Sequence, residues 1–163
     1  MDCSSLSNYN LFDMRVIIQR VIDASVTVGP KTVGSIGHGM LLLVGFEDED
    51  TMDDLEWMVA KICRLRIFDD EDGVMNLSIM ETKGEMLVVS QFTLHAKTKK
   101  GNRPSYIKAA HPDKAIPFYN KFVDMLKTQS GLVVSEGEFG AKMLVLLKND
   151  GPVTIFIDTK NKE

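Results

Sequence analysis

The sequence predicts an α+β domain in which a mainly antiparallel or mixed sheet carries two helices. Three observations lead to this class. Short apolar stretches rich in strand-forming residues recur between turn residues, two longer stretches place apolar residues at helical spacing, and the order runs strands, helix, strands, helix, strands. With 163 residues, 44% of them hydrophobic, the chain is long enough for one domain with a sizeable core.

The first half of the domain is expected to hold four strands and a helix. The strands are predicted at residues 15–21, 24–28, 32–36 and 40–46, with a hairpin turn at Gly29-Pro30-Lys31. Arg20 falls on the face of Val16 and Ile18, so two interpretations stay open. It points inward, or it lies at an edge with its stem on the core and its head in water.

Two stretches have the apolar spacing of helices. In the first, Thr51 is a candidate N-cap with Asp54 three residues later, where a capping box places its acidic partner. Leu55, Met58, Val59, Ile62 and Leu65 then share one face. In the second, Pro112 suits a first helical position, but Pro117 would disturb the next turn, so we expect a regular helix from Pro117 to Ser130.

The stretch from Leu87 to Leu94 begins as a buried strand and then changes character. Leu87-Val88-Val89 is apolar, but Ser90, Gln91 and Thr93 place two hydroxyls and an amide where the pattern predicts core. A buried polar group without a partner costs about 1–3 kcal/mol. Either the strand end opens on a polar pocket, or the strand surfaces there and these residues meet water.

A basic loop and two terminal strands complete the pattern. The loop concentrates four cations in an otherwise acidic chain: Lys97, Lys99, Lys100 and Arg103. It is either a plain surface loop or a phosphate-contacting loop beside the pocket. The strands are expected at 143–147 and 153–157, flanking Lys148-Asn149-Asp150-Gly151-Pro152, with a short strand at 132–134.

Composition excludes several classes of protein. The net charge of −4 argues against a general nucleic-acid binder, although a local basic patch remains compatible with it. No apolar run reaches the length of a membrane span. Residues 1–13 lack Lys, Arg and an apolar segment, so they do not resemble a signal peptide. We expect them to be a flexible N-terminal extension, with the domain covering 14–163.

No cofactor site is predicted. His38, His95 and His111 are far apart, and no Cys or carboxylate stands at ligand spacing from them, so a metal site is not expected. There is no phosphate-binding glycine loop and no dinucleotide fingerprint. Cys3 and Cys63 do not make a disulfide framework, which indicates a reducing, cytoplasmic setting.

Four motifs together resemble the D-aminoacyl-tRNA deacylase family, over residues 14 to 158. They are Met14-Arg-Val-Ile-Ile-Gln-Arg-Val21, Ser90-Gln-Phe-Thr-Leu94, Lys100-Gly-Asn-Arg-Pro-Ser105 and Asn149-Asp-Gly-Pro-Val-Thr154. The resemblance implies a homodimeric enzyme that hydrolyses the ester between a D-amino acid and tRNA, and also accepts glycyl-tRNA. It implies packed sheets with the helices on one side, and no metal or organic cofactor.

The resemblance also implies a site. Ser90, Gln91, Phe92 and Thr93 would form the pocket of one subunit, and Gly151 and Pro152 would reach in from the other. In the family the Gly-Pro bond is cis, and its two carbonyl oxygens accept hydrogen bonds from the substrate's α-ammonium. An L-side chain would then collide with the motif. Arg20 would brace Gly151-Pro152, and Phe139 would line the pocket.

The chemical step is left with two interpretations. Thr93 could act as nucleophile, but it needs a base, and none stands in the motifs. The resemblance instead implies help from the 2′-hydroxyl of the tRNA's terminal adenosine, with Gln91 and Thr93 positioning the acceptor end. Two rival functions remain: a non-catalytic tRNA-binding module that uses the basic loop, and a hydrolase of small esters.

Overall fold

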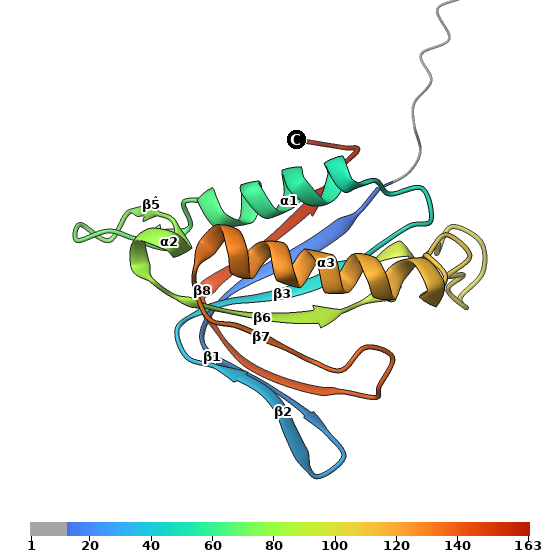
Figure 1. Cartoon of the computed structure of the whole chain (residues 1–163), viewed down its shortest axis with the longest axis horizontal. Coiled ribbons are helices and arrows are strands. Elements are labelled where there is room, and N and C mark those ends of the chain that lie inside the picture. Colours follow the sequence, from blue (N-terminus) through green and yellow to red (C-terminus); the bar gives the residue numbers. More distant parts are fainter. Residues whose placement is uncertain (1–12) are drawn as a thin grey trace, which may run out of the picture.

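The computed structural model describes residues 13–163 and shows one curved, mixed sheet with two long helices on one of its faces (Figure 1). The sheet order is β2-β1-β3-β6-β7, and β8 pairs with β1 beside this path. The strands are β1 (Arg15–Val28), β2 (Lys31–Ile36), β3 (Gly39–Gly45), β6 (Glu85–Ser90), β7 (Val134–Glu136) and β8 (Leu144–Asp158). The predicted α+β class is confirmed, as is the position of the helices.

Strand direction changes across the sheet. β1 runs antiparallel to β2, β3 and β8, whereas β3, β6 and β7 are mutually parallel neighbours. A separate antiparallel pair is formed by β4 (Phe68–Asp69) and β5 (Met75–Leu77). The parallel centre explains the unbroken apolar run of β6, because its residues from Met86 to Val89 are buried on both faces.

In two places, a pair of strands predicted separately forms one continuous strand. The stretches expected at 15–21 and 24–28 form β1, and those expected at 143–147 and 153–157 form β8. β8 pairs with β1 from Arg15↔Asp158 to Thr27↔Leu144, with shifts of register on either side of Val21. The residues between the expected strands are therefore an irregularity within one long ladder, and Gly151-Pro152 lies in it.

The helices begin at residues that cap the free N–H groups of the first turn or that suit its backbone. α1 (Met52–Arg64) has the predicted capping box between Thr51 and Asp54. α3 (Pro112–Ser130) starts at Pro112, which suits the first helical position as expected, but the helix continues through Pro117, where a disturbed turn was expected. Pro117 removes a hydrogen bond to the Asp113 carbonyl, but both residues are exposed, so water can reach that carbonyl. A short helix, α2 (Ile79–Thr82), was not predicted, although Ser78 and Glu81 form a capping box for it.

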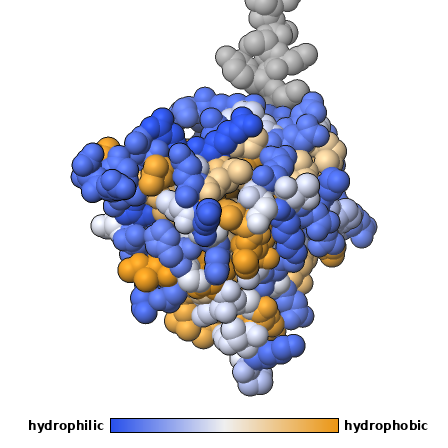
Figure 2. Space-filling model, turned by 60° about the vertical axis from the view of Figure 1, so that its left-hand side comes forward, coloured by the Kyte–Doolittle hydropathy of each residue, from blue (hydrophilic) through white to orange (hydrophobic). Residues whose placement is uncertain are grey.

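The core has two parts because the sheet curls. The larger part lies between the sheet and the helices, where Met58, Ile62 and Phe122 are fully buried. The smaller part lies on the other face, around Val26 and Leu87. Among the described residues, no helix has the length and hydropathy needed to cross a membrane. Apolar side chains nevertheless reach the surface in several places, as one face in Figure 2 shows.

Of the predicted N-terminal extension, residues 1–13, only Asp13 belongs to the described part of the chain. Residues 1–12, with Cys3, lie outside the described part of the chain. Asp13 is 8% exposed, and its carboxylate lies 2.8 Å from Arg15 Nη2. Asp13 therefore packs with the domain.

Candidate active site

A pocket of about 440 Å³ opens where β3 and β6 end. Ser90 is the last residue of β6, and the Gln91 N–H donates to the Val44 carbonyl at 2.7 Å. The chain then turns into a 3₁₀ helix, η1 (Phe92–His95). Ser90, Gln91 and Phe92 all line the pocket. Ser90 and Gln91 therefore border a cavity, as the first of the two interpretations expected, but most of the residues that line the cavity are apolar and Thr93 lies outside it.

Thr93 is tied to its neighbour. The Gln91 amide Nε2 donates to Thr93 Oγ1, and Thr93 itself lies outside the lining of the pocket. This is the one hydrogen bond found for the Thr93 hydroxyl among residues 13–163. No imidazole, ammonium or carboxylate in that part of the chain is bonded to it. Thr93 is thus not arranged as a base-activated nucleophile.

Aromatic side chains form much of the pocket wall. The Phe92 and Tyr106 rings meet edge to face with centroids 5.0 Å apart, and Phe92 is 57% exposed. Phe139, expected as a lining residue, does line the pocket and packs on Tyr119 with centroids 5.6 Å apart. Tyr119 is held in turn, because its hydroxyl donates to the Val88 carbonyl at 3.0 Å.

Arg20 points inward, so the first interpretation of this residue is confirmed. Its side chain is buried and its guanidinium lies beside the irregularity in the β1–β8 ladder. Nε donates to the Asp150 carbonyl at 2.9 Å, and Nη1 donates to the Ile67 carbonyl at 2.8 Å and to Asp69 Oδ1 at 3.1 Å. The guanidinium can be buried here because these hydrogen bonds to oxygen atoms offset the loss of its contacts with water.

The Gly151-Pro152 peptide bond is cis, and Gly151 has φ +140°. The structure brings this motif together with Arg20, but neither residue of the motif lines the pocket of its own chain. The site residues implied by the resemblance therefore form two groups in one subunit. One contains Ser90, Gln91, Phe92 and Phe139, and the other contains Arg20, Gly151 and Pro152.

The basic loop leads directly into the pocket rim. Lys97 and Ser105 pair through two backbone hydrogen bonds of 2.8 and 3.0 Å, which close the loop at its base. Tyr106 and Ile107 follow at once and line the pocket. Four cations of the loop are exposed: Lys97, Lys99, Lys100 and Arg103. Their placement beside a pocket favours the phosphate-contacting interpretation.

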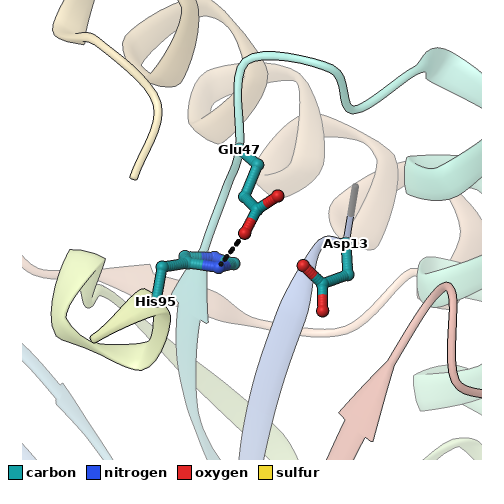
Figure 3. Close-up of side chains that lie close together, drawn as sticks. All are labelled: Asp13, Glu47 and His95. Carbon is teal, nitrogen blue, oxygen red and sulfur yellow. Dashed lines mark hydrogen bonds and ion pairs between the residues drawn. The ribbon is translucent and has the colours of Figure 1, made fainter. Parts of the chain in front are cut away.

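Sequence spacing carried no signal for a buried polar cluster of Asp13, Glu47 and His95 (Figure 3). His95 Nδ1 lies 3.1 Å from Glu47 Oε1, and one ligand atom of each residue lies within 4.8 Å of the others. The spacing is compatible with a bound cation, but the Asp13 carboxylate already neutralises Arg15. Burial lowers the pKa of the His95 imidazole, so the ring is neutral near pH 7.

Comparisons with known proteins identify the family of the chain. The family model for D-Tyr-tRNA(Tyr) deacylase matches residues 17–158. The D-aminoacyl-tRNA deacylase of Parabacteroides distasonis is 59% identical over 150 residues, covering 92% of this chain and all of the relative. That of Bacteroides fragilis is 60% identical over the same shares of both chains.

Solved structures agree with the fold. The structure titled "c-Myc DNA Unwinding Element Binding Protein" superposes with a TM-score of 0.84 at 43% identity, covering 88% of this chain and 97% of that one. A probable eukaryotic D-amino acid tRNA deacylase shares the fold, with a TM-score of 0.77 at 20% identity over 90% and 99% of the two chains. The match of the family model, together with relatives of about 59% identity, shows that this chain belongs to the D-Tyr-tRNA(Tyr) deacylase family.

Proposed function

We propose that this protein hydrolyses the ester bond of D-aminoacyl-tRNA and releases free tRNA and the D-amino acid. The observation that carries the proposal is the pocket at the end of β6, bordered by Ser90, Gln91 and Phe92, in a chain about 59% identical to curated D-aminoacyl-tRNA deacylases. The reaction is a proofreading step that returns tRNA to translation and keeps D-residues out of new proteins.

The pocket suits the end of an aminoacyl-tRNA. The substrate ends in an unpaired adenosine, and proteins commonly hold such bases by stacking them on aromatic rings. Phe92, Tyr106 and Phe139 offer aromatic surface in a pocket of about 440 Å³. The exposed cations between Lys97 and Arg103 lie in the loop between Phe92 and Tyr106, so they can contact the phosphates of the acceptor strand when its end is in the pocket.

The ester is proposed to lie against the first turn of η1. Helices leave their first N–H groups without intrahelical acceptors, so the N–H groups of Phe92 and Thr93 are available as donors. Donors fixed in this way stabilise the oxyanion that forms when water attacks the ester carbonyl. Ser90 and Gln91 border the same space and orient the substrate.

The working unit is proposed to be a homodimer. Gly151 and Pro152 lie outside the pocket of their own chain, so they can contact an amino acid only in the pocket of a partner. Within residues 13–163, β8, which carries the motif, pairs along one side only, with β1. It also exposes three large apolar side chains, with exposed fractions of 63% for Leu144, 59% for Leu146 and 55% for Phe156. Such a strand is suited to pairing between subunits.

Chirality is proposed to be read by exclusion. The carbonyl oxygens of Gly151 and Pro152 would accept hydrogen bonds from the substrate's α-ammonium. With the ammonium held, the side chain of an L-amino acid would collide with the motif, while that of a D-amino acid would point away from it. Glycine has no side chain to exclude, so glycyl-tRNA is an expected second substrate.

The 2′-hydroxyl of the terminal adenosine is proposed to orient or activate the attacking water. The support is the environment of Thr93, whose hydroxyl accepts from the Gln91 amide and has no base beside it among residues 13–163. On this view Thr93 and Gln91 position the RNA end and the ester, and no metal or organic cofactor takes part.

The test is cleavage of matched D- and L-aminoacyl-tRNA by the pure protein, with free tRNA as the product measured. We expect hydrolysis of the D form and sparing of the L form. Equal rates on both forms would refute the chiral site. Binding of tRNA without turnover would identify a tRNA-binding module instead, and turnover of small esters alone would identify a general esterase.

A further inference from the structure

Glu47 and His95 form a buried pair directly behind the pocket. Glu47 is 3% exposed and His95 is 1% exposed, and the distance from His95 Nδ1 to Glu47 Oε1 is 3.1 Å. Neither residue lines the pocket, so neither has a part in the substrate contacts proposed above. Figure 3 shows that the carboxylate comes from the segment after β3 and the imidazole from η1.

The His95 ring supports one wall of the pocket. His95 is the last residue of η1, the turn that begins with Phe92. Its Nε2 lies behind Gly45, where an added Cβ atom would come within 2.9 Å of Nε2 and 2.8 Å of the Gln91 carbonyl oxygen. Gly45, Gln91 and Phe92 all line the pocket, so a shift of the ring would be transmitted to this wall.

The Glu47 backbone supports the facing wall. Glu47 forms an isolated β-bridge with Ala109, and the Ala110 N–H donates to the Phe46 carbonyl at 2.8 Å. Ala109 and Ala110 line the pocket together with Phe46. The Glu47 N–H is itself fixed by Asp50 Oδ2 at 2.8 Å. Residue 47 therefore joins the segment at 109–110 through its backbone and η1 through its side chain.

The direction of the hydrogen bond follows from the charges. A neutral imidazole carries one ring proton. Nδ1 has a partner in Glu47 Oε1 at 3.1 Å, whereas the buried Nε2 has no hydrogen-bond partner among residues 13–163, so the proton is assigned to Nδ1 and His95 donates to Glu47. The charges of Arg15, Asp13 and Asp158 also act on the ring, and Arg15 pairs with both carboxylates, at 2.8 Å from Asp13 and 3.2 Å from Asp158. Both residues are buried, so water does not compete for the bond, which makes it stronger than the same contact at the surface.

We infer that Glu47 and His95 are a positioning pair for ester cleavage, an inference that rests on the function proposed above. The pair fixes the separation between the wall at Gln91–Phe92 and the wall at Ala109–Ala110. It thereby holds the N–H groups of η1 at the place where the oxyanion forms. A displacement of about 1 Å at such a site can lower a rate about 100-fold.

The test compares substitutions that keep the hydrogen bond with substitutions that remove it. His95→Asn retains an N–H donor near the position of Nδ1, whereas His95→Phe retains a ring without a donor. Glu47→Gln retains an acceptor, whereas Glu47→Leu does not. Single-turnover cleavage of D-aminoacyl-tRNA is measured at increasing enzyme concentration, which separates the maximal rate from the concentration needed to reach half of it.

We expect His95→Phe and Glu47→Leu to lower the maximal rate about 100-fold, with the half-saturating concentration nearly unchanged because the basic loop is intact. His95→Asn and Glu47→Gln should recover most of the loss. The stability control is Ser78→Ala, which removes the cap of α2, a helix that does not line the pocket. It should lower the unfolding temperature and leave the maximal rate unchanged.

Two results would overturn the inference. The first is that His95→Phe and Glu47→Leu, which remove the hydrogen bond, are no slower than Ser78→Ala at an equal loss of stability. The second is that His95→Asn or Glu47→Gln, which keep the bond, is as slow as the variant of the same residue that removes it. The wild-type ring tautomer provides a check that needs no activity, because ¹⁵N NMR distinguishes an Nδ1–H from an Nε2–H imidazole. Wild-type protein with an Nε2–H ring would also refute the pair. Inactive wild-type protein with the Nδ1–H ring would refute the proposed function instead.

Discussion

Arg20 Nε donates to the Asp150 carbonyl oxygen at 2.9 Å, although the two residues are 130 positions apart in the chain. The bond spans the point where β1 and β8 lose their regular register. Because Asp150 directly precedes Gly151-Pro152, this one guanidinium fixes the segment that would have to enter the partner's pocket. The same group also binds the Ile67 carbonyl and the Asp69 carboxylate.

Replacing Arg20 by Met should destabilise the protein and abolish selective cleavage. The substitution leaves buried oxygens without donors, and breaking a buried charged network by removing one partner typically costs about 3–5 kcal/mol. Urea denaturation measures the loss. Arg20→Lys should retain part of the stability but less of the activity, because an ammonium cannot reproduce the planar array of donors. Arg66→Met, at an exposed arginine, is the control and should change stability by less than about 1 kcal/mol.

Stability should fall as pH rises through the titration of Asp50. Burial raises the pKa of this carboxyl to about 7, from 3.8 in the unfolded chain. Between these two values the folded state binds the proton and the unfolded state does not, so the free energy of unfolding decreases with rising pH. Above pH 7 both states are ionised and the loss is complete. Chemical denaturation at pH 4, 5.5, 7 and 8 measures this slope.

Asp50→Asn isolates this contribution, because Asn keeps an acceptor for the Glu47 N–H at the place of Asp50 Oδ2 and carries no charge. The variant should lose less stability than the wild type between pH 4 and pH 8, by on the order of 1–3 kcal/mol. Parallel slopes for the two proteins would show that Asp50 titrates normally.

Neutralising the basic loop should weaken tRNA binding and reduce its dependence on salt. The triple change of Lys99, Lys100 and Arg103 to Gln removes up to three phosphate contacts, and each contact contributes about 0.7 to the slope of log affinity against log salt for single strands. Filter binding from 50 to 300 mM salt measures it. Changing exposed Lys31 and Lys83 to Gln is the control. An unchanged slope in the triple variant would return the loop to a plain surface role.

Two defective subunits should restore one active site if the pocket is shared. Gln91→Ala alters the pocket. Gly151→Ala alters the Gly151-Pro152 motif, because the added Cβ would lie 2.9 Å from the Val153 nitrogen of the same chain. Each homodimer should be inactive, but a mixed dimer holds one pocket with both motifs intact. Random mixing should thus recover roughly a quarter of the wild-type sites. No recovery after mixing, with mixed dimers verified by mass spectrometry, would contradict a shared pocket.

Sequence reasoning went furthest where local pattern decides structure. The fold class and the α1 cap at Thr51 could be read from residue spacing. The polar residues from Ser90 marked the place of the pocket, but they left a solvent-exposed strand end as an equal alternative. Sequence reasoning failed where pairing between distant segments decides. β8 looked like two strands because Gly151-Pro152 is a turn signal, and only the length of β1 shows that the ladder continues past it.

The buried pair of Glu47 and His95 shows the same limit. The residues are 48 positions apart. Glu47 is the first residue of the acidic segment that precedes the first helix, and His95 is the first residue of the basic loop. The local pattern therefore places both residues on the surface. Burying a polar group without a partner is costly, so a buried Glu47 requires one, but only the fold identifies that partner as His95.

The substrate's own 2′-hydroxyl should matter more to cleavage than any side-chain hydroxyl. Thr93 Oγ1 accepts from Gln91 and meets no base in the described part of the chain, and the Ser90 hydroxyl likewise has no hydrogen bond to a base there. General acid–base help typically contributes about 10²–10⁴-fold, so its loss is measurable. The test uses D-aminoacyl-tRNA ending in 2′-deoxyadenosine, acylated on the 3′-oxygen, under single-turnover conditions. If the RNA assists, cleavage should collapse while binding persists.

Thr93→Val, which keeps the shape of the side chain and removes the hydroxyl, should slow cleavage of the ribose substrate only by misplacing the ester. Ser90→Ala should lower the rate only slightly. A nucleophilic Thr93 predicts the reverse: the deoxy substrate is cleaved at the normal rate, Thr93→Val is inactive, and an acyl-enzyme can be trapped.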